Sequence, residues 1–241
     1  MVFNISAGHN PDGKIACGAI GLIKESTEAR KVKNEVIRLL KVSGHTVYDC
    51  TVDNGTNQSN VLTNIVKKCN SHDVDLDVSI HFNSGANDKQ GNNKSTGTEV
   101  LLYGANSKAK PYAERVCNAI SKLGFRNRGI KYNTSLYFLR KTLATSMLIE
   151  CCFVDDADDV ALYDYQSMAK AIVEGITGME LKETENSEID KDAEKENSET
   201  PTSDGKSLYR VQVGAYSVLD NAVGMMKKLK NAGFDAFITK S

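Results

Sequence analysis

The sequence predicts an α/β fold in which helices flank both faces of a mainly parallel twisted sheet. Short apolar segments typical of buried strands alternate along the chain with longer segments whose apolar residues recur at helical spacing. This alternation favours parallel strands, because each crossover between parallel strands needs a long connection, usually a helix. The 241 residues, of which 40% are hydrophobic, also suffice for one full domain of about 180 residues and one smaller unit.

The predicted elements follow from these patterns in order. The first strand, residues 2–7, ends at Gly8 and His9, and a glycine-rich loop leads to a helix over 25–43. The apolar stripe of this helix consists of Ala29, Val32, Val36, Leu39 and Leu40. The later elements are a strand at 46–52, a helix at 59–70, strands at 76–81 and 98–103, a helix at 107–123, a strand or hairpin region at 129–140, a strand at 145–150 and a helix at 160–177. We expect the polar loop over 83–97 to be exposed and mobile.

The chain divides by composition into three parts. Residues 1–179 form the predicted α/β domain. Residues 180–206 hold ten Asp and Glu residues against four Lys and almost no large apolar residue. Such a segment cannot bury enough surface to offset the entropy of ordering, so it is predicted to be a disordered linker. Residues 207–241 have the pattern of a small C-terminal β-α-β half-module, which is too short to be stable by itself.

Composition also excludes several classes of protein. The acidic linker and the absence of a basic aromatic surface motif argue against a nucleic-acid partner. No stretch approaches the ~18 apolar residues of a membrane span, so no membrane insertion is predicted. The chain starts directly in a strand and lacks the regions of a signal peptide, so we expect synthesis in the cytoplasm. The six cysteines show no CxxC spacing and are predicted to be reduced thiols, most of them in the core.

Four polar residues stand where α/β folds place chemistry. His9, His81 and Glu150 lie at or near the ends of apolar segments predicted to be strands, and Glu25 opens the first helix. Functional groups in such folds gather outside the carboxyl ends of the parallel strands. Two imidazoles and one carboxylate can form an open zinc site, and a further carboxylate can act as a general base.

Each of these residues also has a structural interpretation. A single histidine at a strand end can be a hydrogen-bonded structural residue, and an acid in the first turn of a helix interacts favourably with the helix dipole. Glu28 lies one turn after Glu25 on nearly the same helix face. The pattern therefore leaves the choice between these two carboxylates open.

The motifs around these residues resemble those of a known family. Residues 2–178 are similar to the zinc-dependent N-acetylmuramoyl-L-alanine amidases of bacterial cell walls, the type found in autolysins and phage endolysins. The matching motifs are Ala-Gly-His (7–9), Gly18-Ala19 with Gly21, Glu25, Gly44-His45-Thr46-Val47, Asp75–Asn83 with its Ser-Ile-His-x-Asn core, Gly97-Thr98-Glu99, and Leu139-Arg140 followed by Leu148-Ile149-Glu150-x-x-Phe153.

This resemblance implies an enzyme with one zinc ion. The implied ligands of the Zn2+ are His9, Glu25 and His81, and the implied catalytic carboxylate is Glu150. The implied reaction is hydrolysis of the amide between the lactyl group of N-acetylmuramic acid and L-alanine in peptidoglycan, which lyses the cell wall. We expect the protein to act on the wall after release from the cell, during phage lysis or mother-cell lysis.

Three further parts of the chain are candidates for binding the wall. Asn83 and Arg140 are candidates for substrate contact by their positions in matching segments, although a loop cap and a surface arginine are equally good interpretations. The segment from Tyr209 to Ala236 resembles the start of a SPOR repeat, a peptidoglycan-binding module built from two β-α-β halves. A half-module of this kind could complete its sheet by forming a homodimer.

Two other functions remain open on the sequence. Similar ligand sets serve zinc carboxypeptidase-like hydrolases, which would cut the wall peptide instead of the lactyl amide. A protein with a degenerate site would bind the wall without cleaving it.

The choice between the two glutamates leads to a first prediction. Replacing Glu25 by alanine should abolish zinc binding and activity, whereas Glu28→Ala should retain both, because only the ligand carboxylate contributes to the metal site. Metal content of the purified variants and clearing of a cell-wall suspension measure the two effects. The opposite pattern would assign the ligand to Glu28.

Overall fold

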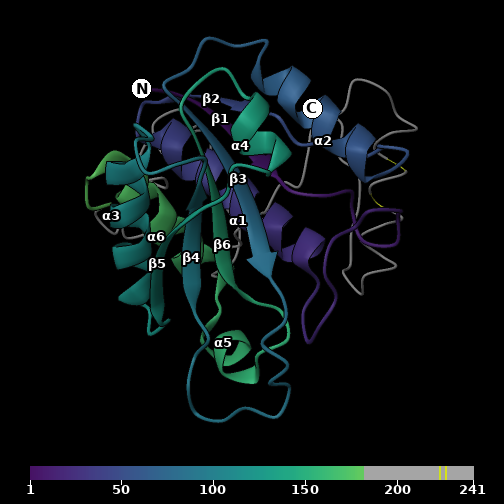
Figure 1. Ribbon diagram of the computed structural model, residues 1–241, viewed down its shortest axis with the longest axis vertical. Coiled ribbons are helices and arrows are strands. Elements are labelled where there is room, and N and C mark those ends of the chain that lie inside the picture. The colour runs from purple at the N-terminus through teal and green to yellow at the C-terminus, as the bar shows by residue number, and fades with distance from the viewer. Residues whose placement is uncertain (182–222, 224–225, 227–241) are drawn as a thin grey trace, which may run out of the picture. The chain divides into compact units, whose positions relative to one another are not determined.

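The computed structural model describes residues 1–181, Val223 and Met226 (Figure 1). The chain divides into two units, Met1–Glu183 and Thr184–Ser241. The predicted linker and half-module lie almost entirely outside the described residues. Within the described part, no helix has the length and apolar character needed to cross a membrane.

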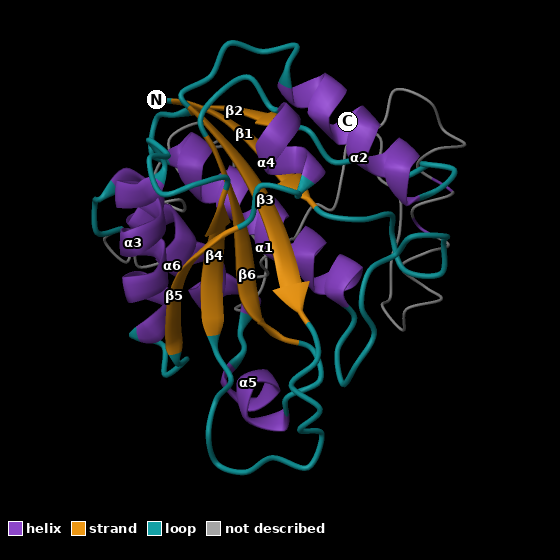
Figure 2. Cartoon of the chain, viewed as in Figure 1, coloured by secondary structure: helices purple, strands orange, loops and turns teal. Residues whose placement is uncertain are grey.

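The described domain contains one six-stranded sheet (Figures 1 and 2). The strands lie in the order β2-β1-β3-β6-β4-β5. Their bounds are β1 Val2–Ala7, β2 Thr46–Asp49, β3 Leu76–Asn83, β4 Thr98–Leu102, β5 Asn127–Tyr132 and β6 Ser146–Phe153. The helices are α1 Glu25–Val42, α2 Gln58–Cys69, α3 Lys110–Ser121, α4 Tyr137–Lys141, α5 Ala157–Leu162 and α6 Tyr165–Thr177. The predicted α/β fold with a mainly parallel sheet is therefore confirmed.

Two strands run against the rest of the sheet. β2, β1, β3 and β6 pair in parallel, whereas β4 pairs with β6 in antiparallel orientation and β5 pairs in parallel with β4. The amino ends of β4 and β5 therefore lie at the same edge as the carboxyl ends of β1, β3 and β6. Residues at the start of two strands and at the end of three others share this edge.

Helices cover both faces of the sheet, and each face has its own apolar core. Helices α1, α3 and α6 pack together on one face, over alternate strand residues such as Phe3, Ile80 and Ile149, which are fully buried. On the opposite face, α2 and α4 contact each other and contribute to a smaller cluster that includes Ile65, Phe138 and Leu148. Side chains alternate between the two faces along a strand, so the residues between the main core positions of β3, namely Asp77, Ser79 and His81, face the α2 and α4 side.

Two predicted elements differ from the structure. The region 129–140 is not a hairpin, because β5 ends at Tyr132 and the chain then forms the short helix α4. The predicted helix over 160–177 is two helices, because the Asp164 side chain accepts a hydrogen bond from the backbone nitrogen of Ser167 and starts α6 as a new N-cap.

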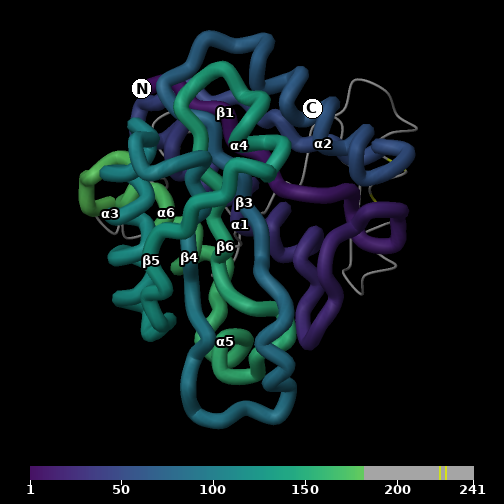
Figure 3. The backbone as a smooth tube through the Cα atoms, in the orientation of Figure 1, coloured from purple at the N-terminus to yellow at the C-terminus, as the bar shows by residue number. Residues whose placement is uncertain are grey.

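The loop between β3 and β4 is largely exposed, as predicted, and its backbone forms hydrogen bonds at several points along its length. Its backbone nitrogens donate hydrogen bonds to four carboxylates that follow β6: Gly85 and Asn87 to Asp155, Asn92 to Asp158, Thr96 to Asp156, and Gly97 to Asp159. Figure 3 shows this loop running beside the segment that leads into α5. The acidic segment offers acceptors to a series of backbone donors, and the mobility of the loop stays a prediction.

Candidate active site

The sheet brings the predicted site residues together at one edge. His81 lies near the carboxyl end of β3, and Glu150 is its registered partner in β6. His9 follows the end of β1 by two residues. Because β1, β3 and β6 are parallel, their carboxyl ends meet at this edge.

Glu25 lies between the two histidines. Its Oε1 atom is 3.2 Å from His9 Nε2 and 3.0 Å from His81 Nδ1. Glu28 contacts neither histidine; its carboxylate instead pairs with Lys31 and accepts a hydrogen bond from the Tyr163 hydroxyl. Helical geometry thus directs the two neighbouring acids to different partners.

The Glu25 carboxylate is buried and held from several sides. It is 4% exposed, and its Oε2 accepts a hydrogen bond from the backbone nitrogen of Ala19 at 2.8 Å. Burial by itself would raise the pKa of Glu25, but the hydrogen bonds with His81 and His9 outweigh it and hold the pKa well below its ordinary value. Glu25 is therefore an ionised carboxylate that faces two imidazoles.

Both imidazoles are oriented by groups outside this cluster. Ser79 Oγ lies 3.0 Å from Nε2 of His81, which leaves Nδ1 to face Glu25. His9 has a φ of 64°, a left-handed conformation that is costly for a residue other than glycine. Arg30 stabilises this turn by donating a hydrogen bond from Nη2 to the His9 carbonyl oxygen at 2.9 Å.

Two glycines give the side chains room to converge. A Cβ on Gly8 would lie 2.0 Å from Cε1 of His81. A Cβ on Gly18 would lie 2.5 Å from Oε2 of Glu25 and 2.9 Å from Cδ2 of His9, and Gly18 also has a φ of 80°. The backbone therefore approaches the cluster more closely than any other residue type would permit.

The three residues fit a metal ion. One potential ligand atom from each of His9, Glu25 and His81 lies within 4.8 Å of the other two. Two imidazoles and one carboxylate are the donor set of an open catalytic metal site. Ser79 contacts the His81 ring and Arg30 holds the His9 backbone, and such contacts to the ligand residues fix the orientation of metal ligands.

Glu150 lies beside this cluster without joining it. Its Oε2 atom is buried and has no hydrogen-bond partner among the described residues. Burial, together with the charges of Glu25 and Glu99, raises the pKa of Glu150 to about 8. A carboxyl group with a pKa near neutrality can both accept and return a proton, as general acid–base catalysis requires.

Two further residues lie at this edge, Glu99 and Arg128, and neither was predicted as a site residue from the sequence. Glu99 is the registered partner of Glu150 in β4, and Arg128 lies near the start of β5 with its Nε 2.7 Å from Glu99 Oε2. Asn83 also contacts this pair, because its side-chain nitrogen donates to Glu99 Oε1 at 3.0 Å. A carboxylate inside an otherwise apolar strand was a signal in the sequence, but the strand direction needed to interpret it was unknown.

The structure also locates Arg140 and the six cysteines. Arg140 is exposed on α4, with its guanidinium 5.9 Å from the centre of the Tyr137 ring, so its role in substrate contact stays a prediction. All six cysteines lie in the described part of the chain and none forms a disulfide there. Cys151 and Cys152 are fully buried in the main core, which favours packing over nucleophilic chemistry.

Comparison with known families agrees with this geometry. Residues 4–178 match the family model of N-acetylmuramoyl-L-alanine amidase. The chain belongs to this amidase family. Its residues 189–240 match the model of the SPOR domain, a match that overlaps the predicted linker as well as the predicted half-module.

Individual relatives are 28% to 35% identical in sequence to this chain. An uncharacterized protein of Clostridium perfringens (strain 13 / Type A) is 35% identical over 203 residues, which cover 81% of this chain and 57% of that protein. The N-acetylmuramoyl-L-alanine amidase CwlM of Bacillus licheniformis is 28% identical over 185 residues, covering 76% of this chain and 64% of that protein. The chain spans 57% to 66% of the length of the curated relatives that it matches.

A solved structure shares the fold of the family member. The catalytic domain of the CD27L endolysin, which targets Clostridia difficile, superposes with a TM-score of 0.67 at 26% sequence identity. The match covers 75% of this chain and 99% of that domain. The fold of residues 1–181 is thus that of an amidase catalytic domain.

The close approach of Gly8 to His81 leads to a second prediction. In a Gly8→Ala variant the new methyl group would displace the His81 ring, so metal affinity should fall about 10- to 100-fold. Competition with a chromogenic chelator measures this affinity. Gly104→Ala is the matched control, since its added Cβ would meet nothing within 4 Å and should leave the affinity unchanged. Equal affinities in both variants would show that the ring can move without loss of the site.

The raised pKa of Glu150 leads to a third prediction, for the protein in the presence of a chelator. The folded-state pKa of about 8 exceeds the value of about 4.3 in an unfolded chain. The stabilising contribution of the protonated carboxyl is therefore fully present below the unfolded value and is lost as the pH rises through about 8.

The variant Glu150→Gln cannot ionise and should not show this loss. We expect the free energy of unfolding of the wild type to fall relative to the variant by more than about 1 kcal/mol between pH ~5 and ~9. Denaturant unfolding at several pH values measures the difference. Parallel stability curves would mean that Glu150 ionises in the folded state as it does in water.

Proposed function

We propose that the chain is a zinc-dependent amidase that hydrolyses the amide between the lactyl group of N-acetylmuramic acid and L-alanine in peptidoglycan. The observation that carries this proposal is the convergence of His9, Glu25 and His81 beside the unpartnered carboxylate of Glu150. This convergence occurs within the residues that match the amidase family. The reaction is inferred from the family, and the four side chains offer the metal ligands and the proton acceptor that this reaction needs.

The proposed ligands of one zinc ion are His9, Glu25 and His81. When bound by such a donor set, zinc acts as a Lewis acid toward a carbonyl oxygen and lowers the pKa of water in its open position. Ser79 holds His81 with Nδ1 toward Glu25, and the Ala19 nitrogen holds the Glu25 carboxylate. The ligands are thus oriented before substrate arrives, which reduces the cost of reorganisation during the reaction.

Glu150 is the proposed general base and acid. Its free Oε2 can accept a proton from the attacking water and then deliver the proton to the nitrogen of the leaving L-alanine. Breaking the amide bond releases a lactyl carboxylate on the sugar and a free amino group on the peptide. The raised pKa of Glu150 suits both transfers, because a carboxylate with a pKa nearer neutrality is a stronger base toward water than an ordinary glutamate and can still return the proton to the leaving nitrogen.

The proposal also includes a role for the C-terminal region and the place in the cell envelope where the protein acts. The SPOR match over residues 189–240 supports binding of this region to peptidoglycan, and a homodimer through it remains part of the proposal. One structural neighbour is the catalytic domain of the CD27L endolysin, and we propose that this chain reaches the wall after release, by phage or mother-cell lysis.

Product identification on purified peptidoglycan tests the proposed reaction. The protein should clear the wall suspension and expose new amino groups, identified as those of L-alanine by dinitrophenyl labelling. A chelator should stop the reaction and zinc should restore it, while Glu150→Gln should keep the metal and lose at least about 100-fold in rate.

Other results would identify other functions. New amino groups on a different residue would indicate a wall peptidase. Clearing that persists after exhaustive metal removal would exclude the zinc mechanism, and retention on the wall without cleavage would indicate a binding protein.

A further inference from the structure

We propose that Arg128, oriented by Glu99, binds the carboxylate of the second residue of the substrate's peptide, the residue that follows L-alanine. Arg128 would then make the enzyme selective for an acidic residue at that position. The inference rests on the proposed function, because it places the scissile amide at His81 and Glu150. It assigns a role in specificity to two residues that lie beside the catalytic edge.

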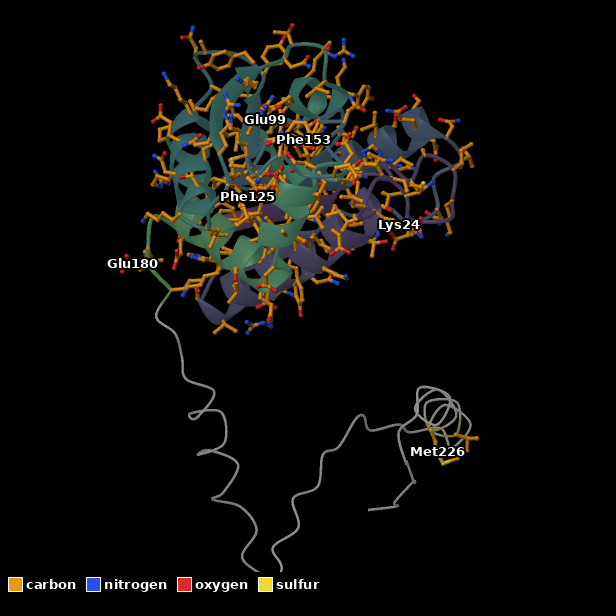
Figure 4. All side chains as sticks on the ribbon, turned by 90° about the horizontal axis from the view of Figure 1, so that it is seen from below. Lys24, Glu99, Phe125, Phe153, Glu180 and Met226 are labelled. Atoms are coloured by element: carbon orange, nitrogen blue, oxygen red, sulfur yellow. The ribbon has the colours of Figure 1, made fainter. Side chains whose placement is uncertain are left out.

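Glu99 owes its position to the reversed strand. β4 is antiparallel to β6, so Glu99, the second residue of β4, is registered with Glu150 near the end of β6. The side chain of Glu99 is on the same face as that of Glu150, because directly opposed residues in a sheet project to the same side. Figure 4 labels Glu99 together with Phe153, which ends β6, in the same part of the described domain.

Each oxygen of the Glu99 carboxylate accepts a hydrogen bond from another side chain. Its Oε1 accepts a hydrogen bond from Asn83 and its Oε2 accepts one from Arg128, at 3.0 and 2.7 Å. The side chain is 10% exposed. Paired in this way with a guanidinium, Glu99 is a positioning residue for Arg128 and has no free oxygen for proton transfer.

The Arg128 guanidinium pairs with Glu99 on one side only, and its other side is available to a ligand. Only Nε is engaged by Glu99, and the guanidinium carbon lies 5.0 Å from the centre of the Phe153 ring. Nη1 and Nη2 have no hydrogen-bond partner among the described residues, and the side chain is 28% exposed. An arginine fixed through Nε and an aromatic ring retains two nitrogens for a carboxylate, the group whose geometry its planar fork matches.

The spacing along the strands selects the position in the peptide. Arg128 contacts Phe153, three residues beyond Glu150, and shares Glu99 with Asn83, two residues beyond His81. Two strand residues span about 7 Å, which is also the span of two residues in an extended peptide. For a peptide that runs from the scissile amide toward Asn83 and Phe153, this spacing assigns Arg128 to the second residue.

The charge at this edge favours one kind of ligand. Glu25, Glu150 and Glu99 are acidic and cannot attract a carboxylate, whereas Arg128 is the cation whose contacts include both Glu99 and Phe153. Arginine remains protonated at all relevant pH values. The second residue recognised here should accordingly be acidic and not its amide.

Paired substrates test this inference. Two N-acetylmuramoyl peptides with C-terminal amides would differ only at the second residue, glutamate in one and glutamine of the same chirality in the other. The wild type should cleave the glutamate substrate with a kcat/KM at least about tenfold higher, mainly through a lower KM, since a charge-assisted hydrogen bond is lost with the amide.

Variants locate the source of the preference. Arg128→Gln should reduce the ratio of the two kcat/KM values to near one, and Glu99→Gln should lower it because Arg128 loses its charged partner. Arg38→Gln is the matched control, since Arg38 pairs with Glu35 within α1 and should keep the wild-type ratio. Zinc content and melting temperature establish that the variants are folded and loaded.

The outcomes separate this inference from the proposed function. Equal cleavage of both substrates by the wild type, or an unchanged ratio in Arg128→Gln, would overturn the role of Arg128 and leave the amidase reaction standing. Cleavage of neither substrate at the lactyl amide would overturn both proposals.

Discussion

The arrangement of the site depends on one interaction, the contact of the Glu25 carboxylate with two imidazoles. Glu25 begins α1, His9 lies in the turn that follows β1 and His81 lies in β3, so the contact connects the helix to two neighbouring strands. A buried carboxylate is costly unless it is paired, and here the two histidines and the Ala19 nitrogen compensate for its burial. The close approach of Gly8 and Gly18, the left-handed turn at His9 and the hydrogen bond from Arg30 all serve to make this contact.

A second constraint is that the pKa values of two carboxylates in the site are shifted in opposite directions. The pKa of Glu25 is lowered by its imidazole partners, whereas the pKa of Glu150 is raised by burial and by the neighbouring acids. Two acids in one site therefore have different chemistry, one suited to holding a cation and the other to moving a proton. The registered pairing of His81 with Glu150 keeps both functions at the same edge of the sheet.

Hydrogen bonds connect the long loop between β3 and β4 to the chain that follows β6. Its backbone donors are satisfied by Asp155 to Asp159, which follow β6 directly. Because β6 also carries Glu150, the loop, the start of β4 and the edge that holds the proposed site are connected through one stretch of chain. Phe153 belongs to the same stretch and contacts Arg128, so the proposed recognition of substrate lies on this connection too.

The sequence by itself determined the α/β class and indicated part of the site, because apolar periodicity and polar residues at strand ends are local signals. His9, His81 and Glu150 could be predicted from such positions, and only the motif resemblance favoured Glu25 over Glu28. The tertiary structure decided the separate contacts of the two glutamates, the break before α6 and the reversed direction of β4 and β5. Strand direction depends on contacts between residues far apart in the chain, which no local pattern contains. For that reason Glu99 and Arg128, at the starts of two strands, became neighbours of Glu150 only in the folded sheet.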